Sequence, residues 1–182
     1  TGTATEVAAE MRVVYGLDLL RIPTNRPVVR AFLGHRVFLD SERRWAAVVE
    51  RAAEMRAAGR ALLIGTRSVK ASELVSARLD AAGLEHVVLN ARQDLSEAEI
   101  VRHAGQSGRI TVATNMAGRG TDIVLSPEVR AVGGLHVILS EYHEAARIDR
   151  QLFGRAGRQG DPGSCEALAA LDDELFTAHA PR

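Results

Sequence analysis

The sequence predicts a doubly wound α/β fold, in which helices cover both faces of a mostly parallel sheet. Short apolar runs recur roughly every 25 residues, about the length of one strand plus one crossover helix. The segments between the runs carry apolar residues at helical spacing. Because the runs are apolar at successive positions rather than at alternate ones, they are typical of strands that are buried on both faces.

Strands and helices are expected to alternate along the chain. The apolar runs begin near Arg36, Ala61, His86, Ile110 and Leu135, and a weaker sixth run begins near Cys165. Helical spacing of three and four follows the first run at Trp45, Val48, Val49, Ala52 and Met55, and the second at Leu74, Val75 and Leu79. Gly59 and Gly83 follow these helices as expected stops. Ser96 and Glu99 predict a capping box for the next helix, which Gly105 follows.

Composition limits the classes of protein to consider. The chain of 182 residues is long enough for one domain with a buried core and short for two. No apolar run approaches the roughly 18 residues that a membrane span needs. Cys165 is the only cysteine, which fits a reducing compartment. None of the six histidines stands in a metal-type cluster, so we expect no metal held by protein ligands.

The stretch 151–163 carries two arginines among glycines. If it is helical, Gln151, Arg155 and Arg158 are spaced by four and three residues and share one face. With Gly154 beside them, the guanidiniums can approach a polyanion without steric shielding, as stabilisation of a transferring phosphoryl group requires. The alternative is a solvated basic helix end whose glycines only permit close packing.

A second glycine-rich stretch contains Gly118, Arg119, Gly120, Thr121 and Asp122. Glycines let the backbone approach a ligand, Arg119 can reach phosphate, and Asp122 can accept hydrogen bonds from ribose hydroxyls. The alternative is a glycine-rich turn with an Arg–Asp surface pair. Since ligands of doubly wound sheets bind outside the carboxyl ends of the strands, we expect both stretches at that edge.

The chain lacks a Walker A loop, because its only lysine, Lys70, follows Val69 rather than a glycine. It therefore cannot cradle a triphosphate in the usual way. Residues 167–171, followed by Asp172, Asp173 and Glu174, imitate a strand that ends in a magnesium-binding acidic pair. Without a Walker A partner, a strand that runs into an acidic helix start is the better interpretation.

Longer motifs carry a family resemblance. The pattern Gln-x-x-Gly-Arg-x-Gly-Arg at 151–158 resembles the last motif of superfamily-2 helicase-type motors, and 113–122 resembles the motif before it. The stretches ATNMAGRGTDI (113–123), GGLHVI (133–138) and GRAGRQGDPGS (154–164) are closer still to the SecA family of bacterial preprotein translocase ATPases. Residues 1–4, 22–27 and 65–68 also resemble that family, so the likeness covers nearly the whole chain.

The resemblance implies a RecA-like second motor lobe with a three-layer αβα architecture, and ATP bound in a cleft between two lobes. Walker A, the catalytic acidic residues and Mg²⁺ would belong to the first lobe, so this chain alone would be inactive. The phosphates would be contacted across the cleft by Arg155, Arg158 and Gln151. The nucleotide-contacting set would comprise Asp122, Arg119, Gly118, Gly120, Thr121 and Gly154, with Arg119 linking nucleotide state to lobe closure.

The resemblance also implies boundaries and partners. Residues 1–27 would lead in from the preceding lobe, 28–176 would form the second motor lobe, and 177–182 a tail, all within a longer protein. The partners would be the first lobe and, through other domains, a preprotein and a SecYEG-type membrane channel. The implied location is the cytoplasm, peripheral at the inner face of the bacterial plasma membrane. No nucleic acid is expected as a partner.

Three sites depart from the family pattern. An arginine is expected where Phe153 stands and another where Tyr142 stands, and Gly-Gly is expected in place of Ser126-Pro127. These departures bear on the contacts with neighbouring domains, and on whether the parent is the housekeeping translocase or a divergent SecA-like relative.

Two other functions remain open. One is the C-terminal lobe of a nucleic-acid helicase or remodeller, against which the balance of 23 basic and 23 acidic residues and an aromatic content of 4% both argue. The other is a stand-alone regulatory module that has lost its first lobe. The abrupt start at Thr1 fits a piece of a longer protein better.

Overall fold

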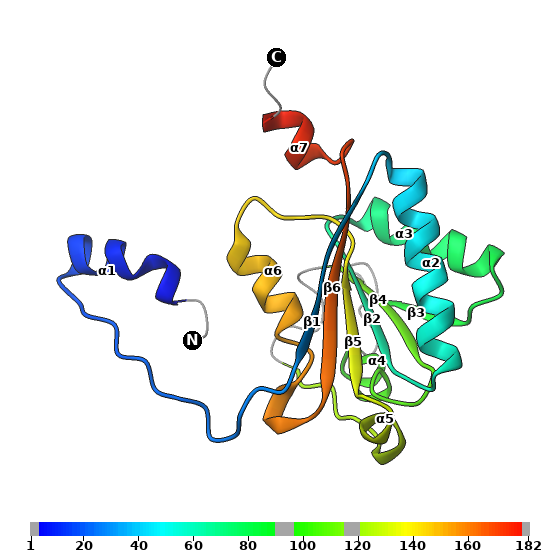
Figure 1. Ribbon diagram of the computed structural model, residues 1–182, viewed down its shortest axis with the longest axis horizontal. Coiled ribbons are helices and arrows are strands. Elements are labelled where there is room, and N and C mark those ends of the chain that lie inside the picture. Colours follow the sequence, from blue (N-terminus) through cyan, green and yellow to red (C-terminus); the bar gives the residue numbers. More distant parts are fainter. Residues whose placement is uncertain (1–3, 90–96, 115–120, 180–182) are drawn as a thin grey trace.

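The computed structural model describes residues 4–89, 97–114 and 121–179. Six strands form one parallel sheet in the order β1-β6-β5-β2-β4-β3 (Figure 1). They are β1 (Ala31–Phe38), β2 (Leu62–Thr66), β3 (His86–Leu89), β4 (Ile110–Thr114), β5 (Leu135–Leu139) and β6 (Gly163–Ala170). The predicted α/β fold with a parallel sheet is therefore confirmed.

The first strand begins earlier than expected. It starts at Ala31 rather than near Arg36, because Gly34 interrupts the apolar run without ending the strand. Gly34 has a φ of 101°, and the pairing of β1 with β6 shifts register between Phe32 and His35. This irregularity is a bulge, which a glycine at positive φ accommodates.

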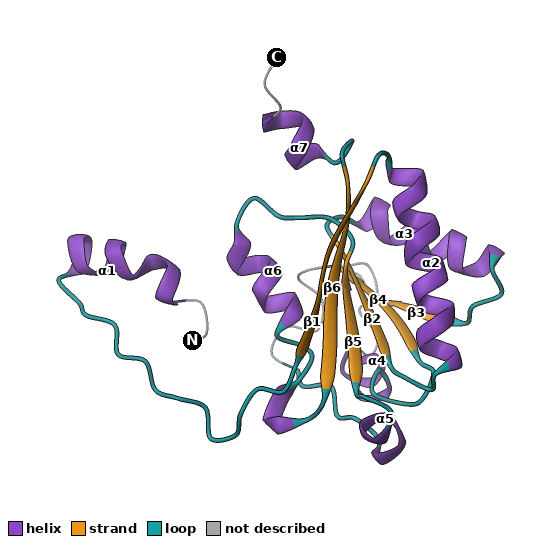
Figure 2. Cartoon of the chain, viewed as in Figure 1, coloured by secondary structure: helices purple, strands orange, loops and turns teal. Residues whose placement is uncertain are grey.

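Helices cover both faces of the sheet, as predicted (Figure 2). One face carries α2 (Ser41–Ala57) and α3 (Val69–Ala81). The other carries α4 (Glu97–His103), α5 (Pro127–Ala131) and α6 (Ala146–Phe153). The remaining helical segments are η1 (Ala4–Val7), α1 (Ala8–Tyr15), η2 (Arg158–Gly160) and α7 (Glu174–His179).

Side-chain caps and glycine stops set the ends of the long helices. The Asp40 carboxylate accepts a bond of 2.8 Å from the backbone N–H of Arg43 at the start of α2. Gly59 and Gly83 follow α2 and α3 with φ of 69° and 68°, which confirms both predicted stops. Ser96 lies outside the described residues, so the predicted capping box stays a prediction.

The α6 face of the sheet is built around a close helix–strand approach. Leu152 of α6 lies over Gly65 of β2, where an added Cβ would stand 2.1 Å from a Leu152 methyl carbon. Gly65 therefore lets α6 approach the sheet closely. The fully buried Val129, Val137 and Ala156 belong to the same apolar cluster.

The exit of β6 has the structure that the preferred interpretation predicted. The Asp173 carboxylate accepts a bond of 2.8 Å from the N–H of Ala170, and α7 begins at Glu174. Asp173 is buried and forms an ion pair with the buried Arg44 of α2. The acidic pair is thus part of a helix start.

Helix α1 lies apart from the layers of the sheet and has no buried residue (Figure 1). It is joined to β1 by the connecting segment, residues 16–30, which contains no helix or strand. None of the helices in the described ranges has the length and apolar character needed to cross a membrane.

Candidate functional site

The stretch 151–163 is not a single helix. Helix α6 ends at Phe153 with Gly154 as its C-cap, and the following turn passes through Gly157 at a φ of 67°. The expectation that Gln151, Arg155 and Arg158 share one helical face is therefore wrong. Gly154 itself is in the right-handed region, and the helix cannot resume past Gly157, since a left-handed residue does not continue it.

The two predicted stretches nevertheless meet. The Arg158 Nη1 lies 2.9 Å from the Asp122 Oδ1, and the Arg158 Nε donates to the carbonyl of Gly154 at 2.9 Å. The Arg155 Nη1 donates to the carbonyl of Thr121 at 3.0 Å. Both arginines of one stretch thus contact the end of the other stretch, and tertiary folding replaces the helical alignment that we expected.

The Arg158–Asp122 pair is open to solvent. The two side chains retain 40% and 50% of their exposure, respectively. An ion pair this exposed contributes little to stability, about 0–1 kcal/mol. A guanidinium also carries more N–H donors than these two contacts use. The arrangement can therefore present a cationic group to an anionic ligand with little loss of stability.

Arg155 and Arg158 do not lie at the carboxyl ends of the strands. The expectation that the stretch 151–163 lies at that edge of the sheet is therefore wrong. Helix α6 runs back along the sheet towards the end where β6 begins (Figure 2). An added Cβ at Gly163, the first residue of β6, would stand 2.7 Å from the Gly157 nitrogen and 3.2 Å from the Leu135 carbonyl oxygen. The loop after α6 therefore packs against the amino ends of β5 and β6.

The other candidate residues divide into two groups. Gly118, Arg119 and Gly120 lie outside the described residues. Gln151 is exposed near the end of α6, and Thr121 and Gly154 contribute the backbone carbonyls described above. In the described part of the chain, no group of three or more His, Cys, Asp or Glu side chains is arranged to hold a metal ion.

Aromatic contacts occupy the positions where arginine was expected. The Phe153 ring meets Phe32 of β1 edge-on at 5.7 Å between centroids. The Tyr142 hydroxyl is hydrogen-bonded to the Nδ1 of His35, and its ring meets Phe176 of α7 edge-on at 6.3 Å. Burial raises the pKa of the Tyr142 hydroxyl, and so does the nearby Asp149 carboxylate. The departures thus join α6 and α7 to the edge strand.

Ser126 and Pro127 also have a local role in the fold. The Ser126 hydroxyl accepts from the N–H of Val129 at 3.4 Å as the N-cap of α5, and Pro127 occupies the first turn. This third departure therefore starts a short helix.

Sequence reasoning missed two residues that touch the arginine-bearing loop. The Arg30 Nη1 donates to the carbonyl of Ala156 at 2.9 Å, and the Arg26 Nη1 donates to the carbonyl of Gln159 at 3.2 Å. These partners are 126 and 133 positions apart in the sequence. Contacts to a backbone carbonyl leave no signature in residue type, so nothing in the pattern could have identified them.

Comparison with known proteins identifies the family of the chain. The family model described as the SecA P-loop domain matches residues 27–130 and 126–181. A protein translocase subunit SecA 2 from Nitrosospira multiformis is 61% identical over 176 residues, which is 97% of this chain and 26% of the relative. The protein translocase subunit SecA from Bacteroides fragilis is 52% identical over 97% of this chain and 16% of its own length. The chain thus spans about a quarter or less of these relatives.

Solved structures share the fold at low identity. The Escherichia coli DEAD-box protein SrmB, bound to the regulator RraA, matches with a TM-score of 0.64 at 21% identity over 84% of each chain. Saccharomyces cerevisiae Dbp5, bound to RNA and ADP BeF3, matches with a TM-score of 0.65 at 16% identity over 98% of this chain and 44% of that one. The fold is therefore RecA-like, and on the strength of the family model and the relatives, the chain belongs to the SecA family.

Proposed function

We propose that this chain is the second nucleotide-binding lobe of a SecA-like, ATP-driven protein translocase motor. Membership of the family supports the motor, and the relatives that cover the chain are named protein translocase subunits. In this proposal residues 1–27 lead in from the first lobe, 28–176 form the second lobe and 177–182 are a tail.

One observation carries the role of the lobe: Arg155 and Arg158 meet Thr121 and Asp122 on a half-exposed patch. Guanidiniums suit phosphate oxygens because they are permanently charged and donate two parallel bonds. A carboxylate suits ribose hydroxyls, which donate hydrogen bonds. The donor and acceptor types present therefore fit a nucleotide.

The residues divide the work between charge and orientation. Arg155 and Arg158, with Gln151, stabilise negative charge on the phosphates of ATP that is bound to the first lobe. Asp122 and the adjoining Gly118–Arg119–Gly120–Thr121 stretch contact the nucleotide, and Gly154 keeps the approach open. Walker A and Mg²⁺ belong to the first lobe. Turnover then requires lobe closure, since the arginines reach the phosphates only when the lobes meet.

The remaining parts of the proposal concern the whole protein. Its partners are the first lobe, an unfolded preprotein and a SecYEG-type channel, and it works in the cytoplasm at the inner face of the bacterial plasma membrane. The balanced charge of 23 basic and 23 acidic residues argues against a nucleic-acid partner.

The test is ATP turnover by the full-length protein, alone, with an unfolded preprotein, and with single-stranded nucleic acid. We expect stimulation by the preprotein only. Stimulation by nucleic acid only would assign the chain to a helicase, whose C-terminal lobe has the same fold. The 182-residue chain itself should hydrolyse no ATP, and measurable turnover by it would contradict the half-site.

A further inference from the structure

The loop that carries Arg158 has a backbone that needs external support. Gly157, Gln159 and Gly160 have φ of 67°, 54° and 81°. For Gln159 this left-handed conformation is unfavourable, since a side chain crowds the backbone there. Surrounding contacts must therefore hold the loop in place.

The main external contact comes from Arg30, the residue before β1. Its guanidinium donates to the Ala156 carbonyl at 2.9 Å in a half-buried setting. Its own Cβ lies where a Gly157 side chain would begin, only 2.7 Å from an added Cβ. The guanidinium also acts on the buried Cys165 thiol of β6, whose pKa burial raises and Arg30 partly lowers. Arg30 thus bridges the loop and the sheet.

A second contact comes from Arg26 of the connecting segment. Its Nη1 donates to the Gln159 carbonyl at 3.2 Å, and its side-chain Cδ lies 3.0 Å from where a Gly160 Cβ would stand. Thr24 fixes the turn before it, because its hydroxyl donates to the Arg26 carbonyl at 2.8 Å. Arg26 is exposed, so this contact is the weaker of the two.

We propose that Arg30, assisted by Arg26, is a positioning residue for Arg158. Through its contact with the Ala156 carbonyl, Arg30 holds the backbone of residues 156–160 in place, so that the Arg158 side chain remains directed at Asp122. Neither residue touches the nucleotide in this proposal. The inference rests on the proposed function, because it assigns Arg30 to the machinery through which Arg158 acts.

The geometry also gives the connecting segment a mechanical role. This segment joins α1, which lies away from the sheet, to β1, and it contacts the loop at two points before the strand begins (Figure 1). A displacement of the connecting segment would therefore move the loop directly, through these two contacts.

The test is a double-mutant cycle on ATP turnover by the full-length protein with unfolded preprotein. Arg30→Ala should lower kcat by roughly 10- to 100-fold, as small misplacements of a reacting group do, and leave KM within about threefold. In the Arg158→Ala background, the same change should lower kcat by less than about threefold. Arg30→Lys should recover part of the kcat, since an ammonium can still donate to the Ala156 carbonyl.

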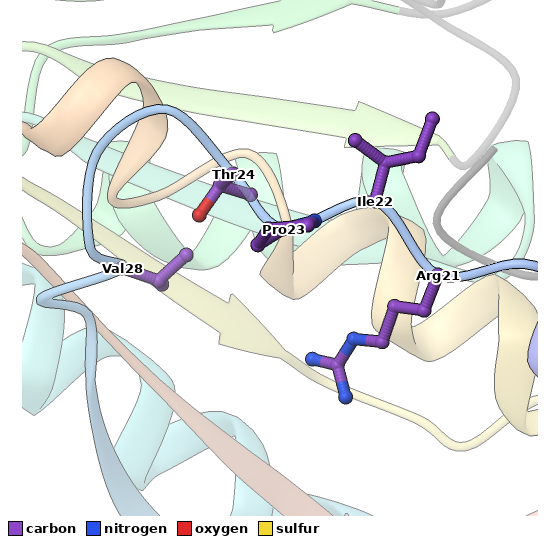
Figure 3. A pocket seen from close by; sticks show the side chains of 5 residues that line it. All are labelled: Arg21, Ile22, Pro23, Thr24 and Val28. Atoms are coloured by element: carbon purple, nitrogen blue, oxygen red, sulfur yellow. The ribbon is translucent and has the colours of Figure 1, made fainter.

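The matched control is Arg21→Ala, in the same segment. Arg21 lines a pocket with Ile22, Pro23, Thr24 and Val28, and Figure 3 shows the Arg21 and Ile22 side chains leaving opposite sides of the segment. We expect kcat within about twofold of the parent. If Arg30→Ala fails to fold by circular dichroism, Arg26→Ala carries the same cycle, with an expected loss in kcat of about three- to tenfold, because its contact is exposed and long.

The outcomes separate the two proposals. Full turnover in Arg158→Ala would overturn the proposed function itself. A thousandfold loss in Arg158→Ala beside unchanged kcat in Arg30→Ala, or in the substitute Arg26→Ala, would overturn only the positioning role. The positioning role would also be overturned if Arg30→Ala lowered kcat by the same factor in the parent and in the Arg158→Ala background. A residue that acts independently of Arg158 would give that result, whereas a residue that acts through Arg158 would have little effect once Arg158 is removed.

Discussion

Two of the arginine–aspartate pairs in the described part of the chain have opposite settings. The side chains of Arg158 and Asp122 are 40% and 50% exposed, while those of Arg44, in α2, and Asp173, after β6, are only 3% and 5% exposed. The buried pair is joined by the Glu141 carboxylate, 3.4 Å from Arg44, and the Arg44 guanidinium stacks on the Trp45 ring at 4.3 Å. Burial raises the pKa of both Asp173 and Glu141, an effect that Arg44 opposes.

The difference shows what burial does to one chemical pair. A buried charge that loses its partner cannot be rehydrated, so the Arg44 pair is committed to joining α2 to the end of β6. An exposed charge that loses its partner returns to water at little cost, so the Arg158 pair can exchange Asp122 for a ligand. Residue type alone does not distinguish the two.

The largest effect on activity is expected at the exposed pair. Arg158→Ala should lower the kcat of the full-length ATPase about a thousandfold, in the range seen for arginine fingers. The free energy of unfolding should change by less than about 0.5 kcal/mol, because the site is at the surface. Steady-state ATP turnover would measure the kcat, and urea denaturation the free energy of unfolding. Unchanged turnover would show that the stretch 151–163 is a solvated turn with no role in ATP hydrolysis.

The largest effect on stability is expected at the buried pair. Arg44→Ala should lower the free energy of unfolding by about 3–5 kcal/mol, since it leaves the buried Asp173 unpaired. Arg43→Ala, one position earlier and 60% exposed, is the matched control and should cost less than about 0.5 kcal/mol. Urea denaturation of the 182-residue chain would measure both, and equal losses would remove the contrast between the pairs.

A smaller effect tests whether Asp122 contacts the nucleotide. Asp122→Ala should raise the KM for ATP about tenfold, which corresponds to the loss of one hydrogen bond to a charged group. The kcat should fall much less than in Arg158→Ala, because Arg158 stays in place. An unchanged KM would limit Asp122 to orienting Arg158 in the free lobe.

The smallest effect is a pH dependence from a third buried group. His136 of β5 has no exposed surface, and its ring lies 2.7 Å from the Ser164 hydroxyl and 3.0 Å from the Glu166 carboxylate. Burial lowers the pKa of His136 below its ordinary 6.5, although Glu166 partly opposes the shift. The unfolded chain therefore binds the proton more readily.

The sign of this effect follows directly. Stability from a lowered histidine pKa is fully present above pH 6.5 and is lost as the pH falls towards the folded-state pKa. Urea denaturation at pH 7.5 and 5.5 should show the lower stability at pH 5.5, with a weaker pH dependence in His136→Gln. A variant with the full dependence of the parent would assign it to other groups.

Much of the fold was predictable because it depends on local pattern. Residues 62–64 and 137–139 are apolar at successive positions, which is typical of strands covered on both sides. Gly59 and Gly83 ended their helices as expected. The start of β1 was misjudged because a bulge at Gly34 breaks the period without breaking the pairing.

The residues of the candidate site were predictable from the sequence, but their arrangement in space was not. Arg155, Arg158 and Asp122 were identified from charge and glycine content, yet the helix that was to align the arginines ends at Phe153. The return of α6 along the sheet also carries the loop to the amino ends of β5 and β6. The direction in which α6 runs along the sheet could not be predicted from the sequence, because it depends on how α6 packs over Gly65.

By itself, the sequence determined the order of strands and helices, the absence of a Walker A lysine motif and the identity of the charged residues. These follow from spacing and residue type, which act over a few neighbouring positions. The tertiary structure alone decided which arginine is buried and which is exposed, and that Arg30 supports a loop 126 positions away. Burial and long-range contacts depend on the packing of distant segments, and the free energy of a charge depends on burial more than on its identity.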